Sequence, residues 1–482
     1  MKKTKIICTV GPSVDDVELL AKMMQSGMDL ARFDFAEGDY EEQNRRLSLV
    51  QSAAEKAGKV IASIADVRKN AKDDILFAAR HGMDYVTAAS VEKADDVLAI
   101  RQLLEQEGLY MGIISKIENL AGTEHIDEIL KVSDGIMLAR AALDAEILAE
   151  DMSVVQKEII ACCNKAGKPV ITADQMLESM CHNDHCTRAE ASDVANCIYD
   201  GTDVIALRCE TFSGKYPLEA VETMARIAER AEKAIDYATS SSKLGAVGRA
   251  HCTDALSHAV VNVANEIKAD VILSITESGY TARTIAKYRP SARVIAVARS
   301  SEKVRAMQLY WGVTPILGPY SAETDEMVDL SIKCAQSHGE ITDGATIVVT
   351  AGTPIGTPGS TNMIKVISVA TKLVHGTGIG KKTVTGKVCN AMRVSDYQEK
   401  LKKGDVIVCD VLNEEFVPLV SKRASAIVCE KAGFTSTAAL VGLKHGLPVI
   451  VGADKATALL WDGQQVTVDP ISGIVYEGEV NL

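Results

Sequence analysis

The chain has 482 residues, of which 47% are hydrophobic, and carries a formal net charge of −13. This length allows several domains of roughly 100–200 residues each, and the negative charge argues against a nucleic-acid partner or an anionic membrane surface. No apolar run approaches the roughly 20 residues that a membrane span needs. The 12 cysteines are scattered without a regular framework, which predicts unpaired thiols and a cytoplasmic protein.

Short apolar runs alternate with helical patterns through the first half of the chain. The runs are Lys5–Val10, Met28–Phe35, Val60–Asp66, Tyr85–Ala89, Gly112–Ile117, Gly135–Ala139, Pro169–Ala173 and Asp203–Leu207. Such units predict a closed (β/α)₈ TIM barrel over residues 1–239, with its active site at the carboxyl ends of the strands. Charged residues follow several of the runs, as that rule requires: Arg32, Asp34, Asp66, Arg68, Lys116, Glu118, Arg140, Asp174, Arg208 and Glu210.

A second α/β domain is expected over residues 240–375, after the low-complexity segment 239–243. Strand-like runs alternate there with helical patterns, as in an open doubly wound sheet: Val271–Ser274, Arg293–Ala298 and Ala345–Thr350. We interpret the glycine-rich residues 376–380 as a linker. Short strands and turns then predict a third, small domain over residues 381–482.

The second domain carries a candidate phosphate site. Its first loop places hydroxyls and a glycine ahead of a helix: Thr276, Ser278, Gly279 and Thr281. Hydroxyls and free N–H groups at the start of a helix suit a phosphate. The Gly- and Pro-rich segment 351–361, which ends at Thr361, would close over the same ligand; two ordinary turns are the alternative reading.

Four segments of the chain resemble the pyruvate kinase family, and the resemblance runs almost end to end. They are Lys5-Ile-Ile-Cys-Thr-Val-Gly-Pro12, Ser115-Lys-Ile-Glu-Asn119, Gly167-Lys-Pro-Val-Ile-Thr172 and Gln308-Leu-Tyr-Trp-Gly312. The third domain resembles the swivelling phosphohistidine domain of phosphoenolpyruvate-utilising enzymes. Thr437 stands where that pattern has its histidine, so a structural or regulatory role is expected there. The resemblance also implies a homo-oligomer, a tetramer or a dimer.

The resemblance assigns roles to the charged residues of the barrel. It implies that Arg32 contacts phosphate, Lys116 stabilises an enolate and Glu118 holds Mg²⁺. Ala142 stands at the position of the second metal carboxylate, which predicts a weak Mg²⁺ site. Asp174 replaces a threonine of the family pattern.

The K⁺ site that the resemblance implies is also altered. Asp66 is retained, whereas Asp34, Ala36 and Val67 occupy the positions of asparagine, serine and threonine ligands. We expect a guanidinium, from Arg208 or Arg68, to replace the ion between Asp34 and Asp66, because arginine can bridge two carboxylates.

The largest departure from the family pattern is a deletion. The family inserts a mobile lid domain after the third strand, and here residues 67–73 run directly into the next helix. The lid excludes water and completes the nucleotide site, and phosphoryl transfer depends on such positioning. The sequence therefore predicts weak or absent phosphoryl transfer from phosphoenolpyruvate to ADP.

Three functional readings follow from the altered site. The first is an impaired family member that senses a phosphorylated metabolite. The second is a rebuilt barrel enzyme of lyase type, acting on an enolate or pyruvate-like substrate through Arg32, Lys116, Glu118, Asp66 and Asp174. The third is a residual pyruvate kinase. Alternatively, Lys116 and Glu118 form a buried salt bridge that has a structural role at the mouth of the barrel.

The segment Cys181-His-Asn-Asp-His-Cys186 invites a metal reading because its side chains include soft ligands. Zinc sites usually draw their ligands from two separated pairs. We therefore expect an exposed loop.

Overall fold

The computed structural model describes residues 2–237, 252–321, 323–352, 361–369, 371–390, 394–431, 433 and 435–480. The chain divides into two compact units, of which the first contains residues 1–268, 272–335 and 348–365. The second contains residues 269–271, 336–347 and 366–482. The expected boundary at 239–240 and residues 353–360 of the predicted covering segment lie outside the described residues.

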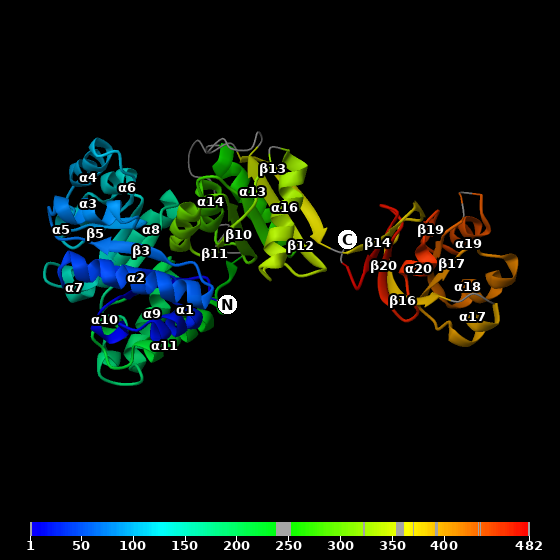
Figure 1. The fold of residues 1–482 in the computed structure, drawn as a ribbon, viewed down its shortest axis with the longest axis horizontal. Coiled ribbons are helices and arrows are strands. Elements are labelled where there is room, and N and C mark those ends of the chain that lie inside the picture. Colours follow the sequence, from blue (N-terminus) through cyan, green and yellow to red (C-terminus); the bar gives the residue numbers. More distant parts are fainter. Residues whose placement is uncertain are drawn as a thin grey trace. The chain divides into compact units, whose positions relative to one another are not determined.

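The first half of the chain forms a closed barrel of eight parallel strands in sequence order, which confirms the predicted TIM barrel (Figure 1). The strands are β1 (Lys5–Thr9), β2 (Leu30–Asp34), β3 (Ala62–Asp66), β4 (Tyr85–Ala88), β5 (Gly112–Ile117), β6 (Gly135–Ala139), β7 (Val170–Ala173) and β8 (Val204–Leu207). Each lies within the corresponding apolar run of the sequence, because a strand buried on both faces needs continuous apolar residues.

Helices lie between the barrel strands. They are α1 (Val17–Ser26), α2 (Tyr40–Ala57), α3 (Lys72–Arg80), α4 (Ala94–Gln106), α5 (Leu120–Glu124), α6 (Ile126–Val132), α7 (Arg140–Leu143), α8 (Ala149–Ala166), α9 (Arg188–Asp200), α10 (Cys209–Phe212) and α11 (Pro217–Glu232), with the short 3₁₀ turns η1 (Pro12–Val14) and η2 (Glu178–Cys181). Side-chain caps fix several starts: Asp16 and Asp39 accept from the first turns of α1 and α2, and Thr187 forms a capping box with Glu190 on α9.

Alternate strand residues divide the barrel packing into two layers. Ile6, Cys8 and Phe33 pack with the surrounding helices, whereas Ile7 and Ile64 belong to an inner cluster. Both layers consist of buried side chains, as is usual for an eight-stranded barrel, whose interior is filled by side chains.

Elements of the α/β domain close the amino-terminal end of the barrel. Leu309 belongs to the inner barrel cluster. Lys5 Nζ donates to the Val313 carbonyl at 2.8 Å, and the Tyr85 hydroxyl donates to the Ala306 carbonyl at 2.8 Å. Since this end is covered, polar ligands must approach the barrel from the carboxyl end of its strands.

The α/β domain has the open sheet that the sequence predicts, in the strand order β11-β10-β9-β12-β13. The strands are β9 (Val271–Ile275), β10 (Arg293–Ala298), β11 (Val313–Leu317), β12 (Ala345–Gly352) and β13 (Thr361–Val369). The helices are α13 (Cys252–Glu266), α14 (Tyr280–Lys287), α15 (Ser301–Ala306) and α16 (Thr324–Ser337), and the 3₁₀ turn η3 spans Met307–Leu309.

The C-terminal region contains an eight-stranded sheet in the order β14-β21-β20-β16-β17-β18-β19-β15. Its strands are β14 (Lys372–His375), β15 (Thr377–Ile379), β16 (Val384–Asn390), β17 (Asp405–Cys409), β18 (Ala424–Cys429), β19 (Val449–Val451), β20 (Gln465–Asp469) and β21 (Ile474–Glu477). Its helices are α17 (Val394–Lys400), α18 (Val417–Arg423), α19 (Thr437–His445) and α20 (Ala456–Leu459), with the 3₁₀ turn η4 (Glu414–Phe416).

The prediction that residues 376–380 form a linker is wrong. Residues 377–379 form β15, which pairs antiparallel with β19. A Cβ atom on Gly378 would lie 1.9 Å from the Pro470 carbonyl oxygen. This glycine therefore permits close backbone packing at the sheet edge, and it does not mark a flexible connection.

Thr437 is the first residue of α19, whose N-cap is Ser436. His445, the last residue of the helix, is exposed. No helix in the described part of the chain is long and apolar enough to cross a membrane.

Candidate ligand site at the barrel mouth

A chain of ion pairs occupies the mouth of the barrel at the carboxyl ends of β2, β3 and β5. Arg32 Nε donates to Asp66 Oδ2 at 2.9 Å, and Arg32 Nη2 contacts the same oxygen. Lys116 Nζ lies 3.7 Å from Asp66 Oδ2 and 2.9 Å from Glu118 Oε1. The Lys116–Glu118 salt bridge, which was the structural alternative for these two residues, is thus present, and it is part of a larger network.

Burial strengthens the ion pair at the centre of this network. Arg32 is 1% exposed and Asp66 is 5% exposed. Burial alone would raise the pKa of Asp66, but the charges of Arg32 and Lys116 outweigh it and hold that pKa well below its usual range. Burial opposes the charge of Arg32, yet Asp66, followed by Asp174 and Asp34, raises the pKa of Arg32. Both groups are therefore charged at neutral pH.

Glu118 is occupied by partners from within the protein. Its Oε2 accepts from the Ser90 backbone N–H at 2.7 Å and from the Ser90 hydroxyl at 3.0 Å, while Oε1 faces Lys116. Ser90 has a left-handed backbone with φ of 50°, a strained conformation that positions both of its donors. Sequence reasoning missed Ser90, although its place just after the β4 run was a usable signal.

The residues at the mouth do not fit the Mg²⁺ site that the family implies. Ala142, in α7, supplies no carboxylate at the second ligand position. Among the described residues, the one group of three closely spaced histidine, cysteine or acidic ligands is Cys181, Cys209 and Glu210, away from Glu118 in the sequence. Mg²⁺ needs oxygen ligands that are free to coordinate it, and the Glu118 oxygens already bind an ammonium and two donors.

The carboxylates expected at the K⁺ site are likewise bound by protein groups. Asp34 Oδ1 accepts from the Ala36 N–H at 3.0 Å, and Asp34 Oδ2 lies 3.4 Å from Arg208 Nη2. Asp66 Oδ1 accepts from the Thr87 hydroxyl at 2.5 Å. Protein donors therefore contact both oxygens of Asp34 and both oxygens of Asp66.

The prediction that one arginine bridges Asp34 and Asp66 is wrong in its details. Arg208 reaches Asp34, but Asp66 is held by Arg32. Arg68 instead forms a bidentate ion pair with Asp74 of α3: Nε donates to Oδ2 at 2.9 Å and Nη2 donates to Oδ1 at 2.5 Å. Each carboxylate thus pairs with a different arginine, and neither Arg208 nor Arg68 bridges the two.

Asp174 and Arg32 keep unpartnered atoms at the mouth. Asp174 Oδ1 and Arg32 Nη1 are buried atoms for which the described residues offer no hydrogen-bond partner. Asp174 and Gln175 both have left-handed backbones, with φ of 68° and 53°. Such conformations cost on the order of 1–3 kcal/mol each and concentrate at functional sites. The sequence analysis proposed Asp174 as a site residue and did not predict this backbone conformation.

Glu210 braces the mouth and does not face a ligand. Its carboxylate accepts from the backbone N–H groups of Leu177 at 3.0 Å and Arg208 at 2.9 Å. Burial raises the pKa of Glu210. The residue therefore ties the loop after β7 to the loop after β8.

A disulfide joins the same two loops, contrary to the expectation of unpaired thiols throughout the chain. Cys181 ends η2 and Cys209 begins α10, and their Cα atoms lie 6.0 Å apart. The pairing was invisible in the sequence because 28 positions separate the cysteines and only the neighbouring ends of β7 and β8 bring them together. His182 and His185 of the same segment are exposed, as the loop reading predicts.

In the α/β domain, the structure brings two predicted segments together. The Thr281 and Thr361 hydroxyls lie 2.6 Å apart, although 80 positions separate them. Thr276 Oγ1 accepts from the Gly279 N–H at 3.0 Å, and Ser278 Oγ accepts from the Tyr280 N–H at 3.4 Å. These two hydroxyls therefore accept hydrogen bonds within the loop that precedes α14, whose N-cap is Gly279, and Ser278 is exposed.

Comparison with known proteins identifies the family. Sequence profiles match for the pyruvate kinase barrel domain at residues 1–71 and 64–221, for the pyruvate kinase alpha/beta domain at 254–367, and for the mobile domain of PEP-utilising enzymes at 401–473. The chain is 36% identical to the pyruvate kinase of Geobacillus stearothermophilus and 35% identical to that of Sporosarcina psychrophila, in alignments that cover 100% of both proteins. The chain belongs to the pyruvate kinase family.

The comparison also locates the main difference. The alignment with the Geobacillus stearothermophilus protein runs over 585 positions, whereas this chain has 482 residues, so roughly 100 positions have no counterpart here. The barrel profile matches in two segments that meet at residues 64–71, around the loop between β3 and α3. The relatives therefore carry a segment that this chain lacks, and the split match points to this loop.

The buried Arg32–Asp66 pair generates a stability prediction. Asp66→Asn leaves the Arg32 guanidinium buried without its carboxylate, so we expect the free energy of unfolding at pH 7 to fall by about 3–5 kcal/mol. The folded-state pKa of Asp66 is depressed, so its contribution is present above the unfolded pKa of about 3.9 and is lost as pH falls below it. Urea unfolding at pH 7 and pH 3 measures this difference.

The matched control is Asp95→Asn, because Asp95 is exposed and surface pairs contribute about 0–1 kcal/mol. An Asp66→Asn protein as stable as the control at pH 7, or a difference that grows toward pH 3, contradicts this account of the mouth.

Proposed function

We propose that this chain is a pyruvate kinase family member with impaired phosphoryl transfer and a binding or regulatory role. The observation that carries the proposal is the state of Glu118, whose two oxygens are bound by Lys116 and Ser90. With Ala142 at the second ligand position, a divalent cation meets one occupied carboxylate in place of a cage. The metal chemistry of the family has no suitable ligand set at this site.

The short connection between β3 and α3 supports the same proposal. β3 ends at Asp66 and α3 begins at Lys72, which leaves too few residues for a domain that encloses a nucleotide. Phosphoryl transfer is driven by positioning and by exclusion of water around the phosphates. A barrel mouth without such an enclosure provides neither.

A phosphorylated metabolite is the ligand that we propose for the α/β domain. The contact between Thr281 and Thr361 supports this proposal because it joins the two segments expected to form the site. Ser278 is exposed at the start of α14, where the helix dipole favours an anion.

A rebuilt enzyme that acts on an enolate or pyruvate-like substrate is the second candidate. The unpartnered Arg32 Nη1 and Asp174 Oδ1 favour it, since a ligand that both accepts and donates a hydrogen bond would satisfy them. The strained backbone at Asp174 and Gln175 fits a functional site as well.

A coupled assay of phosphoenolpyruvate and ADP conversion, with saturating Mg²⁺ and K⁺, tests the main proposal. We expect turnover well below the range of about 1–1000 per second that is usual for enzymes. Ala142→Asp alone should not restore turnover, because the loop between β3 and α3 remains short. The Geobacillus stearothermophilus pyruvate kinase serves as the positive control, and turnover in the usual range would overturn the proposal.

Thermal unfolding with glucose 6-phosphate, ribose 5-phosphate and AMP tests the proposed metabolite site. At least one of them should raise the melting temperature, because a ligand that binds the folded state stabilises it. Ser278→Glu places a carboxylate at the expected phosphate position and should remove that rise, whereas Ser48→Glu, on exposed α2, should not. A rise that persists in Ser278→Glu places the site elsewhere.

A further inference from the structure

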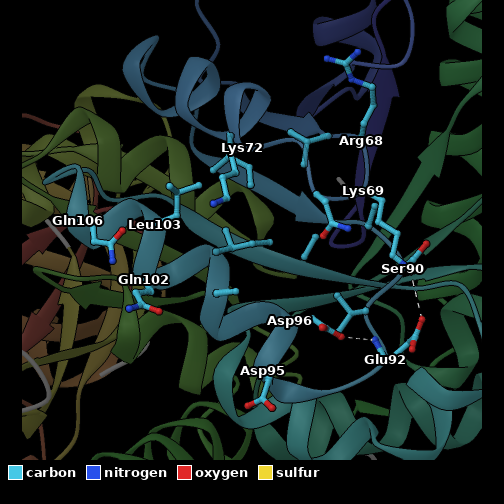
Figure 2. A pocket seen from close by; sticks show the side chains of 18 residues that line it. Arg68, Lys69, Lys72, Ser90, Glu92, Asp95, Asp96, Gln102, Leu103 and Gln106 are labelled. Carbon is cyan, nitrogen blue, oxygen red and sulfur yellow. Dashed lines mark hydrogen bonds and ion pairs between the residues drawn. The ribbon is translucent and has the colours of Figure 1, made fainter.

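A cavity of about 690 Å³ lies between α3 and α4, beside the barrel mouth (Figure 2). This volume is within the range of roughly 300–1,000 Å³ that small-molecule sites occupy. One wall comes from the loop between β3 and α3, and the other from the loop after β4 and the length of α4. The first wall is the loop at which the barrel profile splits, so it is a feature of this chain and not of its longer relatives.

We propose that this cavity binds a small amphipathic monoanion, a molecule with an apolar body and one anionic group. The floor is apolar: Val67, Ile75 and Val91 are buried, and Ile100 and Leu103 are half-buried along α4. Such a surface binds an aromatic or aliphatic body by the hydrophobic effect.

The charged residues of the rim determine where the anionic group of the ligand can bind. Arg68 forms an ion pair with Asp74, and Lys69 on one wall lies 3.5 Å from Glu92 on the other. Asp96 accepts from the backbone N–H groups of Glu92 and Lys93 and is likewise engaged.

Lys72 has no ion-pair partner among the described residues, and Figure 2 shows its side chain beside Leu103. A free ammonium next to an apolar floor favours one negative charge carried by an apolar body. Lys72 is also the first residue of α3, whose N-cap Ala71 supplies no side-chain acceptor. The backbone N–H of Lys72 donates to the Asn70 carbonyl at 3.1 Å, and Asp73 and Asp74 follow in the same turn. The anion is therefore held by the Lys72 ammonium and not by the helix start.

Neutral amides complete the lining at the far end of the cavity. Gln102 and Gln106 line the cavity and are exposed on α4 (Figure 2). Each amide both donates and accepts hydrogen bonds, so this end suits a neutral polar substituent. Asp95 on the same wall would repel a second negative charge, which is the reason for choosing a monoanion over a phosphate dianion.

Fluorescence titration with 8-anilinonaphthalene-1-sulfonate, an aromatic monoanion that brightens on apolar surfaces, tests the proposal on the full chain. The wild type should show saturable binding. Lys72→Glu should weaken the dissociation constant by about tenfold or more, because it replaces the free ammonium with a carboxylate. Lys22→Glu, an equally exposed lysine on α1, makes the same charge change outside the cavity and should alter it less than about twofold.

Ala99→Trp provides a second test that does not depend on charge. Ala99 is exposed on α4 and lines the cavity, so an indole there fills the groove without disturbing the core, and binding should be lost. Thermal unfolding of each variant verifies that it is folded. Absence of saturable binding in the wild type, or binding unchanged in both Lys72→Glu and Ala99→Trp, would overturn the proposal.

Discussion

The ion pair between Arg32 and Asp66 is the interaction on which the barrel mouth depends. Both side chains are buried at the ends of neighbouring strands, and each would be costly to bury without the other. Their pairing fixes Lys116, which lies between Asp66 and Glu118. Lys116 and Ser90 contact both oxygens of Glu118, so this carboxylate belongs to the protein's own polar network.

The barrel fold depends on apolar packing that the charged mouth does not supply. Its eight strands close in sequence order around two apolar clusters, and residues 1–71 and 64–221 match the barrel domain of the pyruvate kinase family. At the mouth, Arg208 pairs with Asp34 and Arg32 pairs with Asp66. Function therefore has to be argued from the site, since the fold alone does not decide it.

The sequence predicted those features that depend on local pattern. Continuous apolar runs defined every barrel strand, and the charged residues that follow them meet at one end because parallel strands share a direction. The shortened connection after Asp66 and the alanine at position 142 were also readable. The sequence did not predict contacts between distant segments. Three of them depend on which loops meet in space: the Cys181–Cys209 disulfide, the hydrogen bonds from Ser90 to Glu118 and the pairing of Arg32 with Asp66. The glycines at 376–380 led to the wrong prediction of a linker, because glycine permits close packing as well as flexibility.

Manganese binding measures the central claim most directly, since Mn²⁺ reports on Mg²⁺ sites by electron paramagnetic resonance. If the mouth is closed by its own ion pairs, titration of the full chain with Mn²⁺ in the presence of oxalate should show no saturable site at the barrel, and Glu118→Gln should leave the titration unchanged. A saturable Mn²⁺–oxalate site that Glu118→Gln abolishes would contradict the account, because it would show that Glu118 remains available to a divalent metal.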